Sequence, residues 1–529
     1  MKTAGKITLS IFSALVLLIA AAFIWADVWV SDLVQREVKN TFSGMEGCEA
    51  SVGDINLFFF SGTAVVKDIH FTAGSIELDV PSIVVGRVSY SALLKGRLWV
   101  HFIRIDSPRL SWAFDEKAPE KSLPNLQDTT LANAGKWLQN VELRHLIIDD
   151  ASASIRSTKT PLKVQVDSLD LHLRDLAYSF VDSVFEYNDS VYDLSLEALS
   201  VKTPDGLFAI DLHDLETEDQ GPLHLGATRF RHTISPRALA DRVKEPVTWV
   251  DVRLNSLSTS PLNPIRKVMA KDWTLESIKA DVALLHASRD ARYAPKKPFH
   301  MPQWYLRSIP AVFIIHHVNA SVQRLDVEFA STNINCGEMH LANIRAHMDN
   351  VTNKPGAVWH NTMRAPVGEK GHAQGIFNMY MDKTCTFNCA LQASNIETNY
   401  LNSFIRPLVG ITCDCHIDSL DTRYSGDSTI AHGSFCMEYH GLKVKVHKED
   451  DIPYKIVTKH ANTFTTLANT LIPKSNPTAV DPAPRSYQVS WKRDPWSPVE
   501  LYIFGPCING VVETMLPGLY VHKQEKKKK

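Results

Sequence analysis

The stretch Leu169-Asp170-Leu171-His172-Leu173-Arg174 alternates leucine with charged or ionisable residues. Successive side chains of a β-strand point to opposite faces, so this pattern predicts a strand with one apolar face and one polar face. The same alternation recurs in four further segments, Ile76–Val80, Val250–Leu254, Leu325–Phe329 and Leu442–Val446. A chain built from such segments is expected to be mostly β, in an antiparallel sheet with one dry face and one wet face.

Helical signals are few and short. Ser235-Pro236 predicts a helix that ends near Lys244, with the serine as N-cap and the proline in the first helical position. A second short helix is expected over Tyr400–Leu408, and Pro473–Arg485 is expected to be a linker. The apolar segment Val499–Met515 is predicted to be helical but broken near Gly505-Pro506, and we interpret it as a cap on the end of the sheet.

So few helices cannot cover the apolar faces of so many strands. Those faces must pack against one another as a sandwich or barrel, or form a trough that holds an apolar ligand. The alternation alone does not choose between these arrangements, because the same side chains serve in either. The residues that would line a trough are Ile76, Leu78, Val80, Leu325, Val327, Phe329, Leu442, Val444 and Val446.

The N-terminus carries a long uncharged segment. Ile7–Ala26 is 20 residues long, follows Lys2 and Lys6, and as a helix would span the ~30 Å core of a bilayer. The lysines predict a cytoplasmic N-terminus and an exported body. A cleaved signal peptide ending at Ala20-Ala21-Ala22 is the alternative, but the apolar run continues beyond that site. The residues assigned to the anchor are Leu15, Val16, Leu17, Leu18, Ile19, Phe23 and Trp25.

Charge and motifs exclude several classes of function. The chain has 56 Lys and Arg against 58 Asp and Glu, so no basic surface for nucleic acid is expected. It contains no G-x-S-x-G, H-E-x-x-H or glycine-rich phosphate loop, so we predict a protein that is not an enzyme and needs no cofactor. The 21 histidines are scattered, and we interpret them as surface or structural residues rather than metal ligands.

The eight cysteines are concentrated in the last third of the chain. Cys413 and Cys415 would share one face of a strand, as would Cys385 and Cys389. Their spacings fit no zinc pattern. We interpret them first as small, half-buried apolar residues, second as a cross-strand disulfide, and third as a thiolate metal site.

Several stretches resemble the AsmA family of bacterial envelope proteins. The N-terminal region reads CEASVGDINLFFFSGTAVVKDIHF over Cys48–Phe71, LLKGRL over Leu93–Leu98 and IDSPRL over Ile105–Leu110. WLQNVELRHLIIDD at Trp137–Asp150 matches the element that restarts the sheet in such proteins, and YLNSFIRPLVGI at Tyr400–Ile411 is similar to their C-terminal part. The cysteines have no counterpart in the family pattern.

The resemblance implies a single-pass inner-membrane protein whose bulk lies in the periplasm. Its fold would be an N-terminal transmembrane helix followed by an elongated, twisted, curled antiparallel β-sheet with an apolar groove. Its partners would be membrane phospholipids and other envelope proteins, in phospholipid transport and outer-membrane homeostasis. A scaffold that assists outer-membrane protein assembly is the alternative. The expected divisions are a cytoplasmic segment at 1–6, the anchor at 7–30, an N-terminal β region at 31–122, a β-groove body at 123–472, and a C-terminal linker, cap and basic tail at 473–529.

Overall fold

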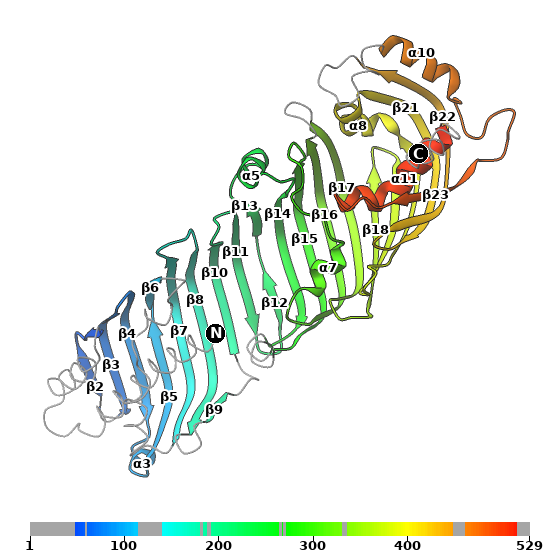
Figure 1. Cartoon of the computed structure of the whole chain (residues 1–529). Coiled ribbons are helices and arrows are strands. Elements are labelled where there is room, and N and C mark those ends of the chain that lie inside the picture. Colours follow the sequence, from blue (N-terminus) through cyan, green and yellow to red (C-terminus); the bar gives the residue numbers. More distant parts are fainter. Residues whose placement is uncertain are drawn as a thin grey trace. The chain divides into compact units, whose positions relative to one another are not determined.

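The computed structural model describes residues 48–58, 61–114, 140–179, 184–187, 192–263, 267, 271–330, 336–447 and 461–515. Over these residues the chain is mostly β, with strands in a large mixed sheet and few, short helices (Figure 1). The chain divides into two compact units, the first Met1–Arg229 with Pro261–Arg266 and the second Phe230–Ser260 with Lys267–Lys529.

The described part of unit 1 consists almost entirely of strands. They are β1 (Cys48–Ser51), β2 (Ile55–Phe58), β3 (Thr63–Ala73), β4 (Ile76–Val88), β5 (Arg97–Asp106), β6 (Arg109–Phe114), β7 (Asn140–Ser157), β8 (Lys163–Ser179), β9 (Val184–Tyr187), β10 (Tyr192–Lys202), β11 (Phe208–Glu218) and β12 (Pro222–Leu225). The short helix α3 (Tyr90–Leu93) connects β4 to β5, and β13 (Thr228–His232) contains the boundary between the units.

Unit 2 has longer strands and most of the helices. The strands are β14 (Thr248–Pro261), β15 (Trp273–Asp290), β16 (Phe313–Ala330), β17 (Cys336–Thr352), β18 (Val358–Val367), β19 (Gly371–Tyr380), β20 (Phe387–Glu397), β21 (Ile411–Gly426), β22 (Ile430–Val446) and β23 (Ser486–Lys492). The helices are α5 (Pro236–Val243), α7 (Pro302–Arg307), the 3₁₀ helix η3 (Thr398–Leu401), α8 (Asn402–Val409), α10 (Ala461–Leu471) and α11 (Val499–Met515).

All five alternating segments are strands, as predicted; they lie in β4, β8, β14, β16 and β22. The sheet is mixed, however, and the prediction of a purely antiparallel sheet is wrong. β5 and β6 run parallel to β7, and β15 runs parallel to β16. A parallel pair needs a long crossover instead of a tight turn, and the segment between β15 and β16 supplies one that contains α7.

The two short predicted helices are confirmed. In α5 the Ser235 hydroxyl accepts a hydrogen bond from the backbone N–H of Ala238 (3.3 Å), and the helix ends at Lys244 in the left-handed conformation. α8 occupies most of the second predicted segment and ends at Gly410, also left-handed. The predicted linker Pro473–Arg485 contains no helix or strand. It lies along β22, where Asn476 forms an isolated β-bridge with Tyr439 and the Leu442 N–H donates to the Lys474 carbonyl (3.0 Å).

The C-terminal helix contradicts one prediction. α11 continues through Gly505 and Pro506 without a break. Proline inside a helix costs about 3 kcal/mol, because it removes a hydrogen bond and crowds the preceding turn. α11 packs on β22 and β23 with Tyr502, Gly505 and Pro506 all buried, so tertiary contacts outweigh that local cost.

Among the described residues, no helix combines the length and the apolarity needed to cross a bilayer. The predicted anchor at 7–30, with its assigned side chains, lies outside the described residues, as do the cytoplasmic segment at 1–6 and the basic run at 526–529.

Candidate functional site on the apolar face of the strands

Apolar side chains line up across neighbouring strands of unit 1. From β3 through β4, β5, β7 and β8 to β10, the paired residues are Val66, Ile83, Ile105, Ile148, Leu171 and Leu194. Directly paired residues of adjacent strands point to the same face. The aligned register therefore joins the one-sided strands of this unit into a continuous apolar row, along strands that lie side by side in Figure 1.

Three of the predicted lining residues lie on β4 at the start of this face. Ile76 and Val80 are buried, with 6% and 5% of their surface exposed. Val80 belongs to a cluster with Ile83 and Ile103, and Leu78 packs against that cluster. These side chains are therefore part of the packed interior of unit 1.

A second apolar row crosses unit 2. Leu254, Val282, Val322 and Ile344 are successive partners in β14 to β17. The row resumes with Ala365, Ala373, Ala393, Leu420 and Met437 in β18 to β22. Its residues in β18 to β20 are alanines. Their side chains project less far from the sheet than the larger side chains on the flanking strands.

The predicted residues of β16 adjoin the first part of this row. Leu325 packs with Val282, Val322 and Ile344 in one cluster. Every residue of that cluster comes from a strand, β14 to β18: Val252, Leu254, Ala280, Val282, Leu285, Val322, Leu325, Leu341, Ile344 and Ala365. Val327 and Phe329 continue along β16 and, like Leu325, are half-buried. We call this strand-built surface the central apolar face.

The predicted residues of β22 are covered by a helix of the same chain. Leu442 and Val444 pack in a cluster with Ala468 and Ile472, the first in α10 and the second just after it. The Asn469 amide accepts from the Val444 backbone N–H (2.9 Å) and donates to the Val444 carbonyl (2.7 Å). The Val446 N–H donates to the Thr465 hydroxyl (2.9 Å). α10 therefore takes the place that a ligand would occupy along β22.

α11 covers the neighbouring strands in the same way. Its Val511 and Met515 pack on the cluster that contains Phe435 and Met437. The helix approaches closely because it presents glycines: a Cβ on Gly510 would lie within 2.5 Å of Cδ1 of Phe435, and one on Gly505 within 2.5 Å of Cδ1 of Trp491. The apolar face is thus roofed over β22 and β23, whereas the described residues of the cluster over β14 to β18 all come from strands, with α8 packed beside it on β17 and β16.

Seven cysteines are free thiols in partly or fully buried positions: Cys336, Cys385, Cys389, Cys413, Cys415, Cys436 and Cys507. This confirms the interpretation as small apolar residues. Burial raises the pKa of Cys413 and of Cys507 to about 11, so both thiols are protonated at neutral pH. Cys385 lies in a turn before β20, not on a strand with Cys389, because its backbone is left-handed (φ 57°).

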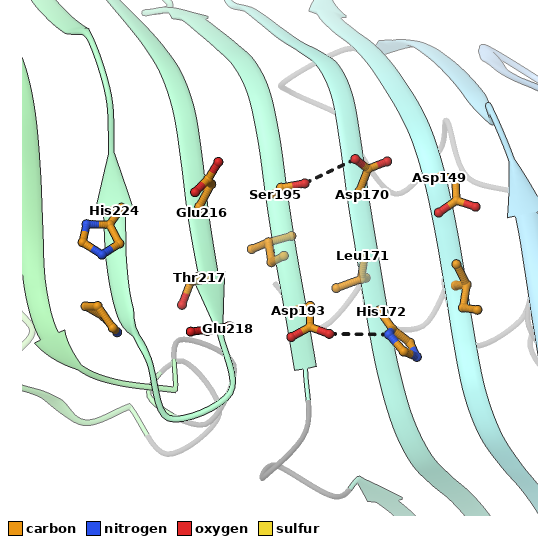
Figure 2. Close-up of a pocket in the computed structure, with 13 residues that line it drawn as sticks. Asp149, Asp170, Leu171, His172, Asp193, Ser195, Glu216, Thr217, Glu218 and His224 are labelled. Carbon is orange, nitrogen blue, oxygen red and sulfur yellow. Dashed lines mark hydrogen bonds and ion pairs between the residues drawn. The ribbon is translucent and has the colours of Figure 1, made fainter.

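Unit 1 carries a hollow that is lined by polar side chains together with Leu171 and Leu194 of the apolar row. It has a volume of about 470 Å³ and lies over β7, β8, β10, β11 and β12 (Figure 2). Its ionisable lining residues are Asp149, Asp170, His172, Asp193, Glu216, Glu218 and His224. The signal was present in the sequence, because these residues occupy the polar positions of the alternating strands.

Cross-strand contacts order this hollow. His172 lies 3.5 Å from Asp193, and the Ser195 hydroxyl donates to Asp170 (3.3 Å), as Figure 2 shows. A second hollow of about 990 Å³ lies in unit 2 over β16 to β20, lined by Val322, Ile344, Ala365, Ala373 and Ala393 together with polar neighbours such as Arg345 and Arg364. None of the nine predicted lining residues belongs to either hollow.

No family model matches the chain. No curated protein matches it either.

Proposed function

We propose that this chain is a membrane-anchored, non-enzymatic protein of the AsmA type that shields the acyl chains of phospholipids in the periplasm. In this proposal the central apolar face contacts the acyl chains, while head groups stay in water. The protein would thereby contribute to phospholipid transport and outer-membrane homeostasis. The anchor and the cellular location in this proposal rest on the N-terminal sequence and on the AsmA-like stretches.

The observation that carries the proposal is the composition of the central apolar face. The described residues of its cluster come from strands, and Leu325 in the cluster and Val327 and Phe329 beside it keep part of their surface exposed. A contiguous apolar surface of this kind is typical of a binding site. Covering one acyl CH₂ gains ~0.8 kcal/mol, so a chain of lipid length would be strongly favoured over its exposed state.

Because helices of the same chain cover β22 and β23, acyl contact is proposed for only part of the apolar face. Leu442, Val444 and Val446 lie under α10, so acyl chains are expected on Leu325 and its neighbours but not on β22. This difference within one protein provides an internal control.

The test places a photo-activatable benzophenone residue at Leu325 or at Leu442 in the full-length chain expressed in bacteria. After irradiation, mass spectrometry of the purified protein measures covalent phospholipid adducts. We expect an adduct at Leu325 and little or none at Leu442. The proposal fails if Leu325 gives no adduct, or if both positions react to the same extent.

A further inference from the structure

Two histidines and one aspartate converge on the outer, polar face of unit 2. His317 of β16 is the register partner of Asp349 of β17, and Asn319 is the partner of His347. Nδ1 of His317 lies 2.7 Å from Oδ1 of Asp349, and Nε2 of His347 lies 3.0 Å from the same oxygen. The two imidazole rings are nearly parallel, 14° apart, with centroids 6.2 Å apart.

The hydrogen bonds fix which nitrogen of His347 is available. Nδ1 of His347 lies 2.8 Å from Oδ1 of Asn319. An amide oxygen only accepts, so Nδ1 carries the proton and a neutral ring keeps the lone pair on Nε2, directed at Asp349. Metal-binding histidines are commonly held in this way, with the second ring nitrogen donating to a neighbouring acceptor.

In a neutral ring the Nε2 lone pair of His347 points at Oδ1 of Asp349, the oxygen that His317 also faces. A metal ion placed between these three atoms would be bound by all of them.

The distances suit a metal ion. The three candidate ligand atoms all lie within 4.8 Å of one another. Zinc binds histidine nitrogen and carboxylate oxygen at about 2.0–2.2 Å, which in a tetrahedral site separates ligand atoms by roughly 3.3–3.5 Å. The observed 2.7 and 3.0 Å need to lengthen by roughly 0.3–0.8 Å, which side-chain rotation on adjacent strands can supply.

The sheet register places a further imidazole next to this cluster. His360 of β18 is the direct partner of Asp349, so it lies on the same face, and its side chain is exposed. Lys279 of β15 pairs with Asn319 on the other side and brings a positive charge that lowers the affinity for a cation.

We propose that His317, His347 and Asp349 form a binding site for Zn²⁺, with Asn319 orienting His347. The ligands come from adjacent strands, so the ion would clamp β16 to β17 on the face opposite the central apolar face. Binding through Nδ1 of His317 displaces the proton from that nitrogen, and the neutral ring then carries its proton on Nε2, so no net proton leaves a ring that was neutral before binding. The site is independent of the lipid proposal.

The test measures Zn²⁺ binding to the purified full-length chain by competition with a chromophoric chelator, after removal of metal. A His70→Ala background eliminates a second cluster of His70, Glu77 and Asp79 in unit 1. The background protein should bind one Zn²⁺ at the proposed site. Asp349→Asn and His347→Ala should each weaken binding by about 10-fold or more, and Asn319→Ala by about 10-fold.

The matched control is His340→Ala. His340 also lies on β17 with Nδ1 2.7 Å from a carboxylate oxygen, that of Asp326, but it stands outside the cluster. Its replacement should leave Zn²⁺ binding unchanged, and the metal-free unfolding midpoints should show that all variants fold. The proposal is overturned if the background protein binds no Zn²⁺, if Asp349→Asn and His347→Ala bind it as tightly as the background, or if His340→Ala weakens binding as much as they do.

Discussion

The packing of α11 on the strands predicts a large effect of adding one methyl group at Gly510. A Cβ there would lie within 2.5 Å of Cδ1 of Phe435, whereas carbon atoms in contact are about 3.5–4.0 Å apart. Phe435 is fully buried at 0% exposure and cannot move aside. The helix must therefore shift by about 1 Å or distort, and overpacking of this kind costs about 1–3 kcal/mol or more.

A competing term acts in the opposite direction. Alanine is a better helix former than glycine by about 1 kcal/mol. Because the overlap with the Phe435 ring is severe, we take the upper end of the overpacking range, which leaves Gly510→Ala destabilising by about 2 kcal/mol. At roughly 2–4 °C per kcal/mol for a unit of this size, the unfolding midpoint should fall by about 4–8 °C.

The assay is thermal unfolding of the full-length protein, followed by hydrogen exchange of 499–515 to localise the change. Ile508→Ala is the control, because this side chain in the same helix is 41% exposed and its loss should alter the midpoint little. If Gly510→Ala is as stable as the control, or more stable, the close approach of α11 to β22 is incorrect.

Two further predictions concern unit 1. Tyr192 is fully buried, and its hydroxyl donates to the carbonyl of Leu262 (2.9 Å) while lying 3.1 Å from the Thr217 hydroxyl. Tyr192→Phe should lower the free energy of unfolding by about 1–3 kcal/mol, because it leaves buried acceptors unpaired. Chemical denaturation would measure this loss. The hydrogen bond to Asp79 raises the pKa of His70 above its ordinary value of about 6.5. The charged pair therefore stabilises the fold fully below about pH 6.5 and loses this contribution as pH rises through the raised pKa, so an NMR titration should show the His70 pKa falling in Asp79→Asn. An unchanged pKa in that variant would contradict the assignment.

The alternation in the sequence was sufficient to predict the strands but not their connections. Leu169–Arg174 and Leu442–Val446 lie in strands, since polar–apolar alternation follows directly from strand geometry. The parallel pairing of β15 with β16 depends on the path of the chain between them, which alternation does not encode. The continuous helix at Gly505-Pro506 depends on contacts with Phe435 and Trp491, which are distant in sequence.

The candidate site was predictable only in part. The sequence identified apolar faces, yet Leu325 and Leu442 have the same pattern and different surroundings, because α10 covers only the latter. The face to which alternate residues of β16 point also changes along the strand. Val322 and Leu325 are three residues apart, so a regular strand would place them on opposite faces, yet they share one cluster. The change falls opposite Asn343, whose left-handed backbone (φ 54°) rotates β17 there, and the sequence gives only a weak signal for such a position. The His317–His347–Asp349 cluster was missed because its residues come from two strands whose register was unknown.

The central claim is that acyl chains lie on one face of the strands and not on the other. Val327 and Glu328 test it most directly, because they are adjacent in β16 and point to opposite faces, Val327 to the central apolar face. The decisive measurement is the yield of phospholipid adducts from a photo-activatable residue at each position in the full-length protein. A yield several-fold higher at Val327 than at Glu328 is the predicted result. Equal yields, or adducts confined to Glu328, would contradict the account.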